Sequence, residues 1–591
     1  MAELNPSPKK SRGLIGSEMV KEGLITPKQL EFALEEQLKL GKDKEELLGE
    51  IMLKAGFINE SALIKFLEEY LGVPYASLRR KGDIDLFAVR MIPEKMARNF
   101  KVIPVAFDAK TNKLIIAMAN PFDLVALDTL QTKTGYRIEK RFSFTKGIEE
   151  AIDKAYSEEI MQKSVTEFVD FKTAELKAVE EKKEKTGKEQ LEAEAVKTPV
   201  IQFVDSLLKS AIQKNASDIH IEPQEDRLSI RFRIDGLLQN AMPSPKEMQS
   251  AVITRVKLLG NMDIAEQRLP QDGRFKVEFK GKNIDIRLAS VPTIYGEKLV
   301  MRILDSSTLM VKMEDLGITA KDIEEFKSIL VQPYGMILVT GPTGSGKTTT
   351  LYSALSYINT PDKNIVTIED PVEYQIKGIN QIQVKQQIGL TFSLGLRTVL
   401  RQDPDIIMIG EIRDLETLEN AVKASLTGHL VLSTIHTNDA PSVVLRLMHM
   451  GLEPYLISAC VNLIIAQRLV RKICEFCKEK TTIKPSMLQA LGKRSNINLA
   501  NMSFYQGKGC ERCDNTGYKG RTGLYEFLPA SKKMKETIVE GNVKEEELRK
   551  VAQQAGMKTI FQHGLEKVNQ GITTMEEVLR VTVLEKISEK E

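Results

Sequence analysis

The 591-residue sequence contains no tryptophan, and only 6% of its residues are aromatic. The chain also lacks a large excess of charge of one sign, because 84 Lys and Arg are balanced by 81 Asp and Glu, which gives a formal net charge of +3. Proteins that bind single-stranded nucleic acid combine a basic surface with aromatic side chains for stacking. The composition therefore argues against a helicase or DNA translocase, which is one alternative function for this chain.

Long apolar runs are missing as well. Residues 1–12 are polar and lack the apolar core of about 7 to 15 residues that a secretory signal needs. The most apolar stretch, residues 455–470, is interrupted by Asn462, Gln467 and Arg468 and is shorter than the ~20 residues of a membrane-spanning helix. We therefore expect a cytoplasmic protein in which residues 455–470 form a buried helix.

Cysteine is scarce, with five residues in the chain. Cys460 lies in the apolar stretch and is expected to be an inert core residue. The other four form two Cys-x-x-Cys pairs, which in a reducing compartment indicate a metal site rather than disulfides. Four thiolates can surround Zn²⁺ tetrahedrally and leave no open position, so we expect a structural zinc site. Its ligands are Cys474, Cys477, Cys510 and Cys513.

The length exceeds that of one domain, since domains usually hold about 100 to 200 residues. The first part contains an internal duplication, in which residues 14–37 align without a gap on residues 47–70. The aligned glycines and leucines predict two copies of a small helical unit, followed by an α/β continuation. The predicted boundaries are an N-terminal domain over 1–160, a charged linker over 161–197, a second domain over 198–310 and an ATPase domain over 311–591 that includes a zinc element at 474–513.

Arginines recur on predicted strands of the second domain. Residues 228–234 alternate apolar residues with arginine and serine, which is the pattern of a half-buried strand. Two further predicted strands, 284–288 and 299–304, carry Arg287 and Arg302. Guanidinium groups on a sheet next to a nucleotide motif favour a phosphate-facing surface.

That nucleotide motif is a P-loop in a strand, loop and helix context. An apolar run over 336–340 precedes it, and a helical pattern over 349–357 follows it. The glycines allow backbone N–H groups to converge on phosphate oxygens, Lys347 can reach the β- and γ-phosphates, and Thr348 can hold Mg²⁺. The predicted ATP-binding residues are Gly341, Pro342, Thr343, Gly344, Ser345, Gly346, Lys347, Thr348 and Thr349.

Acidic residues follow two apolar strands near the P-loop. Glu411 ends the run 406–410 and takes the Walker B position. Glu369 and Glu373 follow the strand 365–368 and can also reach the carboxyl edge of a parallel sheet. Which of these carboxylates acts as the general base is left open by the sequence.

A set of longer motifs marks a resemblance. They read SDIHIEP (217–223), RFRIDG (231–236), RLPQDGR (268–274), GPTGSGKT (341–348), TIEDPVEY (367–374), RQDPDIIMIGEIRD (401–414) and TGHLVLSTIHTND (427–439). With them the chain resembles, over nearly its whole length, the type II/type IV secretion ATPase superfamily, and within it the type IV pilus assembly (extension) ATPases. A type II secretion ATPase shares these motifs and is the alternative, but the long N-terminal region with its duplicated repeat favours the pilus enzyme.

The resemblance implies a homohexameric ring motor in which a PAS-like α+β N2 domain and a RecA-like motor domain clamp ATP at the subunit boundary. It implies a motor at the cytoplasmic side of the inner membrane that acts on a platform protein, together with cytoplasmic ring proteins and without nucleic acid. The zinc element is also typical of assembly ATPases.

The resemblance also implies residue roles. Lys347 and Thr348 would bind phosphate and Mg²⁺, Glu411 would be the Walker B acid, and Glu373 or Glu369 would orient or deprotonate the attacking water. Two histidines would sense the γ-phosphate, and five arginines would serve the closed interface, where a guanidinium that arrives on closure couples hydrolysis to movement. These residues are His429 and His436, and Arg287, Arg302, Arg397, Arg401 and Arg413.

The N-terminal repeats resemble a cyclic di-GMP receptor module whose repeats begin with Arg-Leu-Gly. Here Leu14 and Leu47 stand in place of both arginines, and Gln37 aligns with Tyr70. Loss of the guanidiniums removes planar donors suited to guanine edges or phosphate. We therefore expect weak or absent cyclic di-GMP binding and a docking role for this module.

Overall fold

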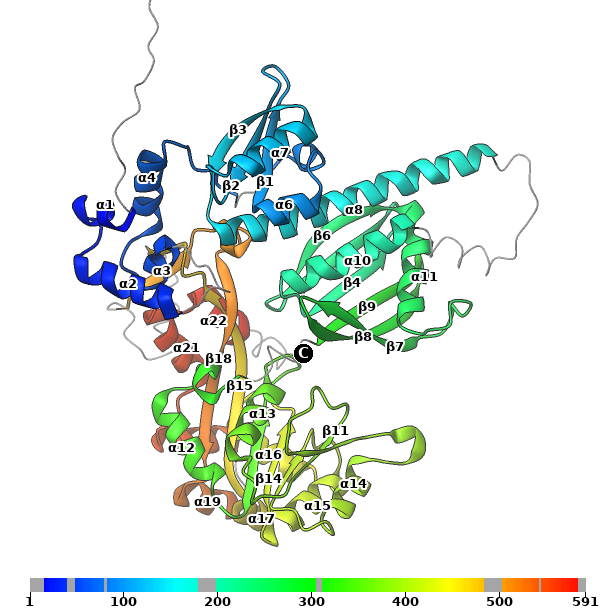
Figure 1. Ribbon diagram of the computed structural model, residues 1–591. Coiled ribbons are helices and arrows are strands. Elements are labelled where there is room, and N and C mark those ends of the chain that lie inside the picture. Colours follow the sequence, from blue (N-terminus) through cyan, green and yellow to red (C-terminus); the bar gives the residue numbers. More distant parts are fainter. Residues whose placement is uncertain are drawn as a thin grey trace, which may run out of the picture. The chain divides into compact units, whose positions relative to one another are not determined.

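A computed structural model describes residues 15–39, 48–78, 82–178, 198–304, 311–482, 502–540 and 544–582 (Figure 1). Its contacts divide the chain into two compact units, residues 1–210 with 250–255 and residues 211–249 with 256–591. Both units combine helices and strands, which confirms the predicted α/β multidomain class. Most of the predicted linker, residues 179–197, lies outside the described residues, and so do Leu14 and Leu47.

The duplicated sequence forms two similar helix pairs. Gly23 and Gly56 take the same left-handed conformation, with φ of 72° and 71°, at the turn between the helices of each pair. A Cβ on Gly16 would lie 2.5 Å from Leu30, and a Cβ on Gly49 would lie 3.2 Å from the equivalent Leu63. The repeat therefore preserves a helix contact as well as a sequence. The helices are α1 (Ile15–Lys21), α2 (Pro27–Lys39), α3 (Leu48–Lys54) and α4 (Glu60–Leu71).

The rest of the first unit is a three-stranded sheet with helices. β1 pairs antiparallel with β2, and β2 pairs parallel with β3, around a buried apolar core. The elements are α5 (Leu86–Val89), α6 (Glu94–Phe100), β1 (Val102–Asp108), β2 (Lys113–Met118), α7 (Leu124–Thr134), β3 (Arg137–Phe142) and α8 (Thr145–Ala178), followed by α10 (Thr198–Gln213). Among the described residues, no helix has both the length and the apolar character needed to cross a membrane.

The second unit begins with an antiparallel sheet in the strand order β6-β5-β4-β9-β8-β7. The predicted strand 228–234 is confirmed as part of β5, with buried apolar residues alternating with arginines and a serine. Arg287 of β8 lies directly opposite Arg302 of β9. The elements are β4 (Asp218–Pro223), β5 (Arg227–Ile234), β6 (Leu237–Pro245), η2 (Lys246–Met248), α11 (Gln249–Leu259), β7 (Gln271–Phe279), β8 (Lys282–Thr293) and β9 (Gly296–Leu304).

A seven-stranded sheet follows, in the order β12-β11-β13-β14-β10-β15-β18, parallel except for the last pair. Helices cover both of its faces, so β10 and β14 are buried along their whole length. The elements between residues 313 and 460 are η4 (Met313–Leu316), α12 (Ala320–Leu330), β10 (Gly335–Thr340), α13 (Lys347–Ile358), β11 (Ile365–Glu369), β12 (Asn380–Gln383), η5 (Gln386–Ile388), α14 (Phe392–Val399), β13 (Ile406–Ile409), α15 (Leu415–Leu426), β14 (Leu430–Ile435), α16 (Ala440–His449) and α17 (Pro454–Cys460).

The described residues from 461 to 582 form two long strands, a small antiparallel strand pair and four helices. β15 and β18 pair antiparallel, and the strand pair β16–β17 extends from their far end. The elements are β15 (Val461–Ile473), β16 (Lys478–Thr481), β17 (Phe504–Gly507), η7 (Glu511–Cys513), β18 (Tyr518–Pro529), α19 (Lys532–Val539), α20 (Glu545–Gln554), α21 (Ile560–Asn569) and α22 (Met575–Thr582).

The prediction of a buried helix over 455–470 is wrong. A helix covers only the beginning of this stretch, α17, and the chain then continues as β15. A strand that is buried on both faces reads as an unbroken apolar run, and periodicity alone does not separate it from a buried helix.

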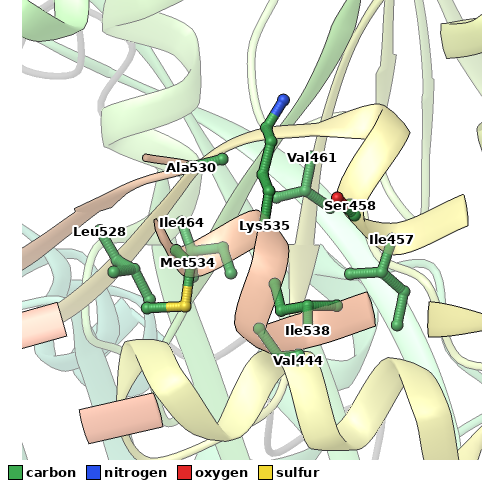
Figure 2. A pocket seen from close by; sticks show the side chains of 10 residues that line it. All are labelled: Val444, Ile457, Ser458, Val461, Ile464, Leu528, Ala530, Met534, Lys535 and Ile538. Atoms are coloured by element: carbon green, nitrogen blue, oxygen red, sulfur yellow. The ribbon is translucent and has the colours of Figure 1, made fainter. Parts of the chain in front are cut away.

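The end of α17 and the start of β15 border a small apolar pocket (Figure 2). Aliphatic side chains and Met534 line it, and the ammonium of Lys535 points away from them. The pocket therefore belongs to the core between α16, α17, α19 and the strands, and offers no cluster of polar groups to a ligand.

Candidate functional site

The P-loop follows β10 at the carboxyl edge of the parallel sheet. Gly341, Gly344 and Gly346 have φ of 146°, 79° and 89°, conformations that side chains rarely adopt. A Cβ on Gly341 would lie 2.5 Å from the carbonyl oxygen of Gln467. The loop leads directly into α13, whose first N–H groups form an anion-binding end. The strand, loop and helix order expected from the sequence is therefore present.

Lys347 is folded back onto its own loop. Its Nζ donates hydrogen bonds to the carbonyl oxygens of Gly341, at 2.8 Å, and Pro342, at 3.1 Å. Burial lowers the pKa of Lys347, Glu411 opposes that shift, and the neighbouring Arg468 adds to it. The ammonium thus lies within its own loop, where it contacts two backbone carbonyl oxygens.

A polar pocket opens beside the P-loop. Glu411, the predicted Walker B residue, lies two residues past β13 and is mostly buried. One carboxylate oxygen lies 2.5 Å from Arg413, and the other lies 3.4 Å from Nε2 of His436. The pocket brings together Lys347, Thr348, Leu351, Glu369, Asp370, Pro371, Glu373, Phe392, Met408, Gly410, Glu411, Thr434 and His436.

The two other candidate carboxylates differ in their surroundings. Glu369, at the end of β11, is only 3% exposed and accepts hydrogen bonds from Tyr352, Thr367 and Gln381. Burial raises the pKa of Glu369, although these hydrogen bonds oppose the shift. Glu373 is one-third exposed and lies 3.2 Å from Arg287 of the six-stranded sheet.

Arg287 also donates a 2.7 Å hydrogen bond to the carbonyl oxygen of Val372. A guanidinium from the six-stranded sheet therefore reaches the carboxylate cluster beside the P-loop. The structure thus brings three of the predicted site residues, Arg287, Glu373 and Lys347, to one region of the second unit.

Other predicted residues lie elsewhere in the chain. Arg302 pairs with Asp218 of its own sheet, at 3.0 Å. Arg397 pairs with Glu416, and Arg401 donates to the carbonyl oxygen of Arg397. None of these three arginines lines the polar pocket described above.

His429 is also separated from the P-loop. It precedes β14, and its carbonyl oxygen accepts from Gly335 at the start of β10, whereas the P-loop follows the end of β10. Its Nδ1 lies 2.9 Å from the carbonyl oxygen of Ala424. Within this chain the structure brings only His436 of the two predicted histidines to the pocket.

The segment 436–440, which follows β14 and ends at the first residue of α16, carries features that the sequence did not reveal. Each of its five consecutive residues contacts a different element through an ion pair or hydrogen bond. In chain order the partners are Glu411, Thr340, Arg468, Arg549 and Glu526. The segment therefore links the Walker B carboxylate to the end of β10, to β15, and to the C-terminal part of the chain.

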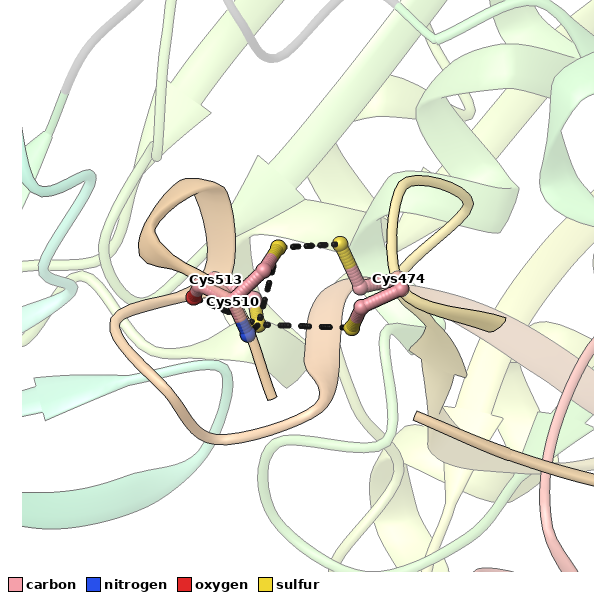
Figure 3. Close-up of side chains that lie close together, drawn as sticks. Cys474, Cys510 and Cys513 are labelled. Atoms are coloured by element: carbon pink, nitrogen blue, oxygen red, sulfur yellow. Dashed lines mark hydrogen bonds between the residues drawn. The ribbon is translucent and has the colours of Figure 1, made fainter. Parts of the chain in front are cut away.

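The four paired cysteines converge (Figure 3). All four Sγ atoms lie within 4.8 Å of one another, with Cys474–Cys510 at 3.7 Å, Cys477–Cys513 at 3.9 Å and Cys510–Cys513 at 3.7 Å. Tetrahedral coordination with Zn–S bonds of about 2.3 Å places sulfur atoms roughly 3.8 Å apart. The donor set and its spacing therefore fit a tetrahedrally coordinated metal ion.

Backbone groups prepare this cluster for negative charge. The N–H groups of Cys510 and Gly517 both donate to Sγ of Cys513, at 3.2 Å. Gly507 and Gly517 pack backbone to backbone, so that a Cβ on Gly507 would lie 2.0 Å from the carbonyl oxygen of Gly517. This contact closes the loop of Cys510 and Cys513 at its base. Backbone hydrogen bonds from Cys474 to Gly517, at 2.9 Å, and from Lys508 to Cys477, at 3.0 Å, join it to the loop of the first pair.

The chain is similar to known proteins over most of its length. Residues 193–580 match the family described as Type II/IV secretion system protein, and residues 71–162 match the MshEN domain. The chain is 43% identical over 570 residues, 96% of its length and 98% of the relative's, to a protein of Myxococcus xanthus named type IV pilus assembly ATPase PilB. It is 40% identical to the protein of that name in Pseudomonas aeruginosa, over 90% of this chain and 92% of the relative. Type II secretion system protein E of Xanthomonas campestris is also 40% identical, with the same coverage.

Proposed function

Because the chain belongs to the type II/IV secretion system protein family and is an ATPase, we propose that it forms a hexameric ring that powers type IV pilus assembly at the inner membrane. The observation that carries the proposal is the likeness to a pilus assembly ATPase along 98% of that relative, including the N-terminal region. Type II secretion is the alternative, since a relative of that name is nearly as similar.

In the proposed reaction, ATP lies with its phosphates on the P-loop. The backbone N–H groups of the loop and Lys347 bind the β- and γ-phosphates, and the carbonyl contacts of Lys347 are exchanged for phosphate oxygens. Thr348 and Glu411 line the same pocket and are suited to hold Mg²⁺, which neutralises phosphate charge when bound. Glu373 and Glu369 are the candidates to orient or deprotonate the attacking water.

Arg287 supports a coupling between hydrolysis and movement. Its guanidinium comes from the six-stranded sheet and contacts Glu373. A γ-phosphate beside Glu373 offers Arg287 a second anionic partner, so its preference changes between the ATP and ADP states. We propose that this exchange moves the six-stranded sheet relative to the motor sheet and that a platform protein in the membrane receives the motion.

We also propose that the four cysteines hold Zn²⁺ in a structural role. All four positions of a tetrahedral ion are taken by protein sulfur, so the site supplies rigidity rather than Lewis-acid chemistry. The N–H groups that point at Cys513 favour the thiolate form that such an ion requires.

Gene deletion and complementation test the proposed function. We expect a strain without this gene to lack surface pili while secreting its type II substrates normally, and the full-length gene to restore the pili. Complementation with Lys347→Ala should fail although the protein is produced. Loss of type II secretion with intact pili would select the alternative.

The N-terminal module is proposed to dock onto the membrane machinery and to bind cyclic di-GMP weakly or not at all. The match to the MshEN domain covers residues 71–162, beyond the repeats whose first positions are leucine. Isothermal titration of the full-length protein with cyclic di-GMP should give no saturable heat at micromolar concentrations. A stoichiometric submicromolar complex would show that other residues replace the missing arginines.

A further inference from the structure

Two consecutive polar residues of β15, Gln467 and Arg468, lie behind the P-loop. β10 ends at Thr340, which pairs with Ala466, so β15 continues alongside the loop after β10 has ended. Gln467 is 1% exposed and Arg468 is 5% exposed. A buried guanidinium is costly unless its donors are satisfied, so its partners indicate what it holds in place.

Gln467 faces α13. Its Oε1 accepts a 2.7 Å hydrogen bond from the hydroxyl of Thr350 in that helix. Its Nε2 lies 2.8 Å from the place that a Cβ on Gly346 would occupy. The carboxamide therefore packs against the last glycine of the P-loop and fixes the start of α13.

Arg468 contacts the other end of the loop. Its Nη1 donates to the carbonyl oxygen of Gln467 at 3.1 Å and lies 3.2 Å from the place of a Cβ on Gly341. Its Nη2 donates at 2.7 Å to the carbonyl oxygen of Asn438, in the segment 436–440. One guanidinium thus lies between the first glycine of the P-loop and the segment that carries His436.

These contacts connect two halves of the pocket. Lys347 belongs to the P-loop, whereas His436 contacts Glu411 from the segment 436–440. Both halves must contact the same γ-phosphate for it to be transferred, and small misplacements of such groups cost orders of magnitude in rate. Besides these contacts, the charge of Arg468 contributes to the lowered pKa of Lys347.

We propose that Arg468 is a positioning residue for ATP hydrolysis, whose guanidinium holds the P-loop and the segment 436–440 in the register that turnover requires. The proposal rests on the ATPase activity of the chain. It gives the arginine a role in kcat, because the P-loop keeps its own backbone donors for ATP and loses only its alignment with His436 and Glu411.

The test compares three variants of the full-length protein by steady-state ATP hydrolysis. Arg468→Met should lower kcat at least 30-fold while the KM for ATP changes less than threefold. Arg468→Lys keeps the charge but presents one donor group instead of a planar fork, so it should recover part of kcat and remain at least threefold below wild type. Arg471→Met is the matched control: Arg471 lies on the same strand, is mostly buried and binds Glu577, away from the polar pocket.

Arg471→Met should keep kcat within about twofold of wild type even if its unfolding midpoint falls. Equal losses of kcat in the Met variants of Arg468 and Arg471, or a loss at Arg468 that lies entirely in KM, would overturn the proposal. If Arg468→Met does not fold, the kcat of Arg468→Lys decides. A wild-type kcat in that variant would contradict the requirement for a planar guanidinium. Absence of ATP hydrolysis in the wild-type protein would contradict the ATPase function instead.

Discussion

The polar pocket at the P-loop and the cysteine cluster are built in opposite ways. The cluster draws on two short segments, 474–477 and 510–513, whose sulfur atoms converge at the spacing of a coordinated ion. The pocket draws on segments that span residues 347 to 436, and its charged groups are already paired with protein partners. On the functions proposed above, one site would be completed by an ion, whereas the other would act when its groups exchange partners. Substitutions should accordingly separate stability from turnover.

Lys347→Ala should have the largest effect, a loss of about 10³-fold or more in ATP hydrolysis, because preorganised charge at a transferring phosphate is worth several kcal/mol. Its Nζ contacts only two loop carbonyls, so the unfolding midpoint should change little. Phosphate release and thermal unfolding measure the two quantities, with Lys321→Ala on the exposed side of α12 as control. Near wild-type turnover would show that the pocket is not the hydrolytic site.

Arg287→Ala should reduce turnover at least tenfold with a smaller change in ATP affinity, because the residue contacts the carboxylate cluster from another sheet. Arg302→Ala is the matched comparison, since it lies directly opposite on β9 but pairs with Asp218. We expect it to lose less turnover. Equal losses in both variants would show that Arg302 also acts in turnover, despite its ion pair with Asp218.

Cys474→Ser should abolish stoichiometric metal binding and lower the unfolding midpoint by several degrees, while turnover at low temperature falls less than in the preceding variants. The reason is that a structural ion contributes folding free energy and does not take part in phosphoryl transfer. Cys460→Ser serves as control, because Cys460 is equally buried but lies outside the cluster. Metal analysis should give about one zinc per chain in wild type and in Cys460→Ser. Absence of metal from protein purified without chelator would contradict the proposed zinc site.

Glu577→Gln should leave turnover nearly unchanged and alter only the response to acid. Burial raises the pKa of Glu577, but hydrogen bonds from Arg580 and Arg471 outweigh it and lower the pKa to about 2. Since the unfolded value is near 4.5, this carboxylate stabilises the fold above pH ~4.5, by about 3 kcal/mol at most, and the contribution is lost as the pH falls toward 2. Urea unfolding from pH 7 to 3 should show the difference between wild type and variant shrinking with acid. A constant difference would assign the effect to packing.

The sequence predicted the parts of the fold whose signals are local. The P-loop between a strand and a helix and the alternating strand 228–234 depend on neighbours in the chain, and both are present. The spacing of the cysteines predicted their convergence for the same reason. The stretch 455–470 was misassigned because burial between β10 and β18 removes the periodicity that distinguishes strand from helix.

The sequence did not predict which residues that are distant in the chain lie close together in the fold. Membership of one motif suggested that His429 and His436 act together, yet β14 separates them, and only its final end faces the P-loop. Gln467 and Arg468 were interpreted only as interruptions of an apolar run. The sequence did contain a signal for them, because a charged side chain within a buried apolar run must form hydrogen bonds or ion pairs.

β15 gives the enzyme a mechanical property. The strand carries Arg468 behind the P-loop and ends at Ile473, one residue before Cys474. Arg468 and the cysteine cluster are therefore about 20 Å apart along one strand. It is paired with β18 along this length, with one irregularity between Arg471 and Ile473. A hydrogen-bonded pair of strands resists bending more than a loop does. With the proposed nucleotide site beside Arg468 and the proposed zinc site just beyond Ile473, β15 is a direct connection along which a movement at one site would reach the other.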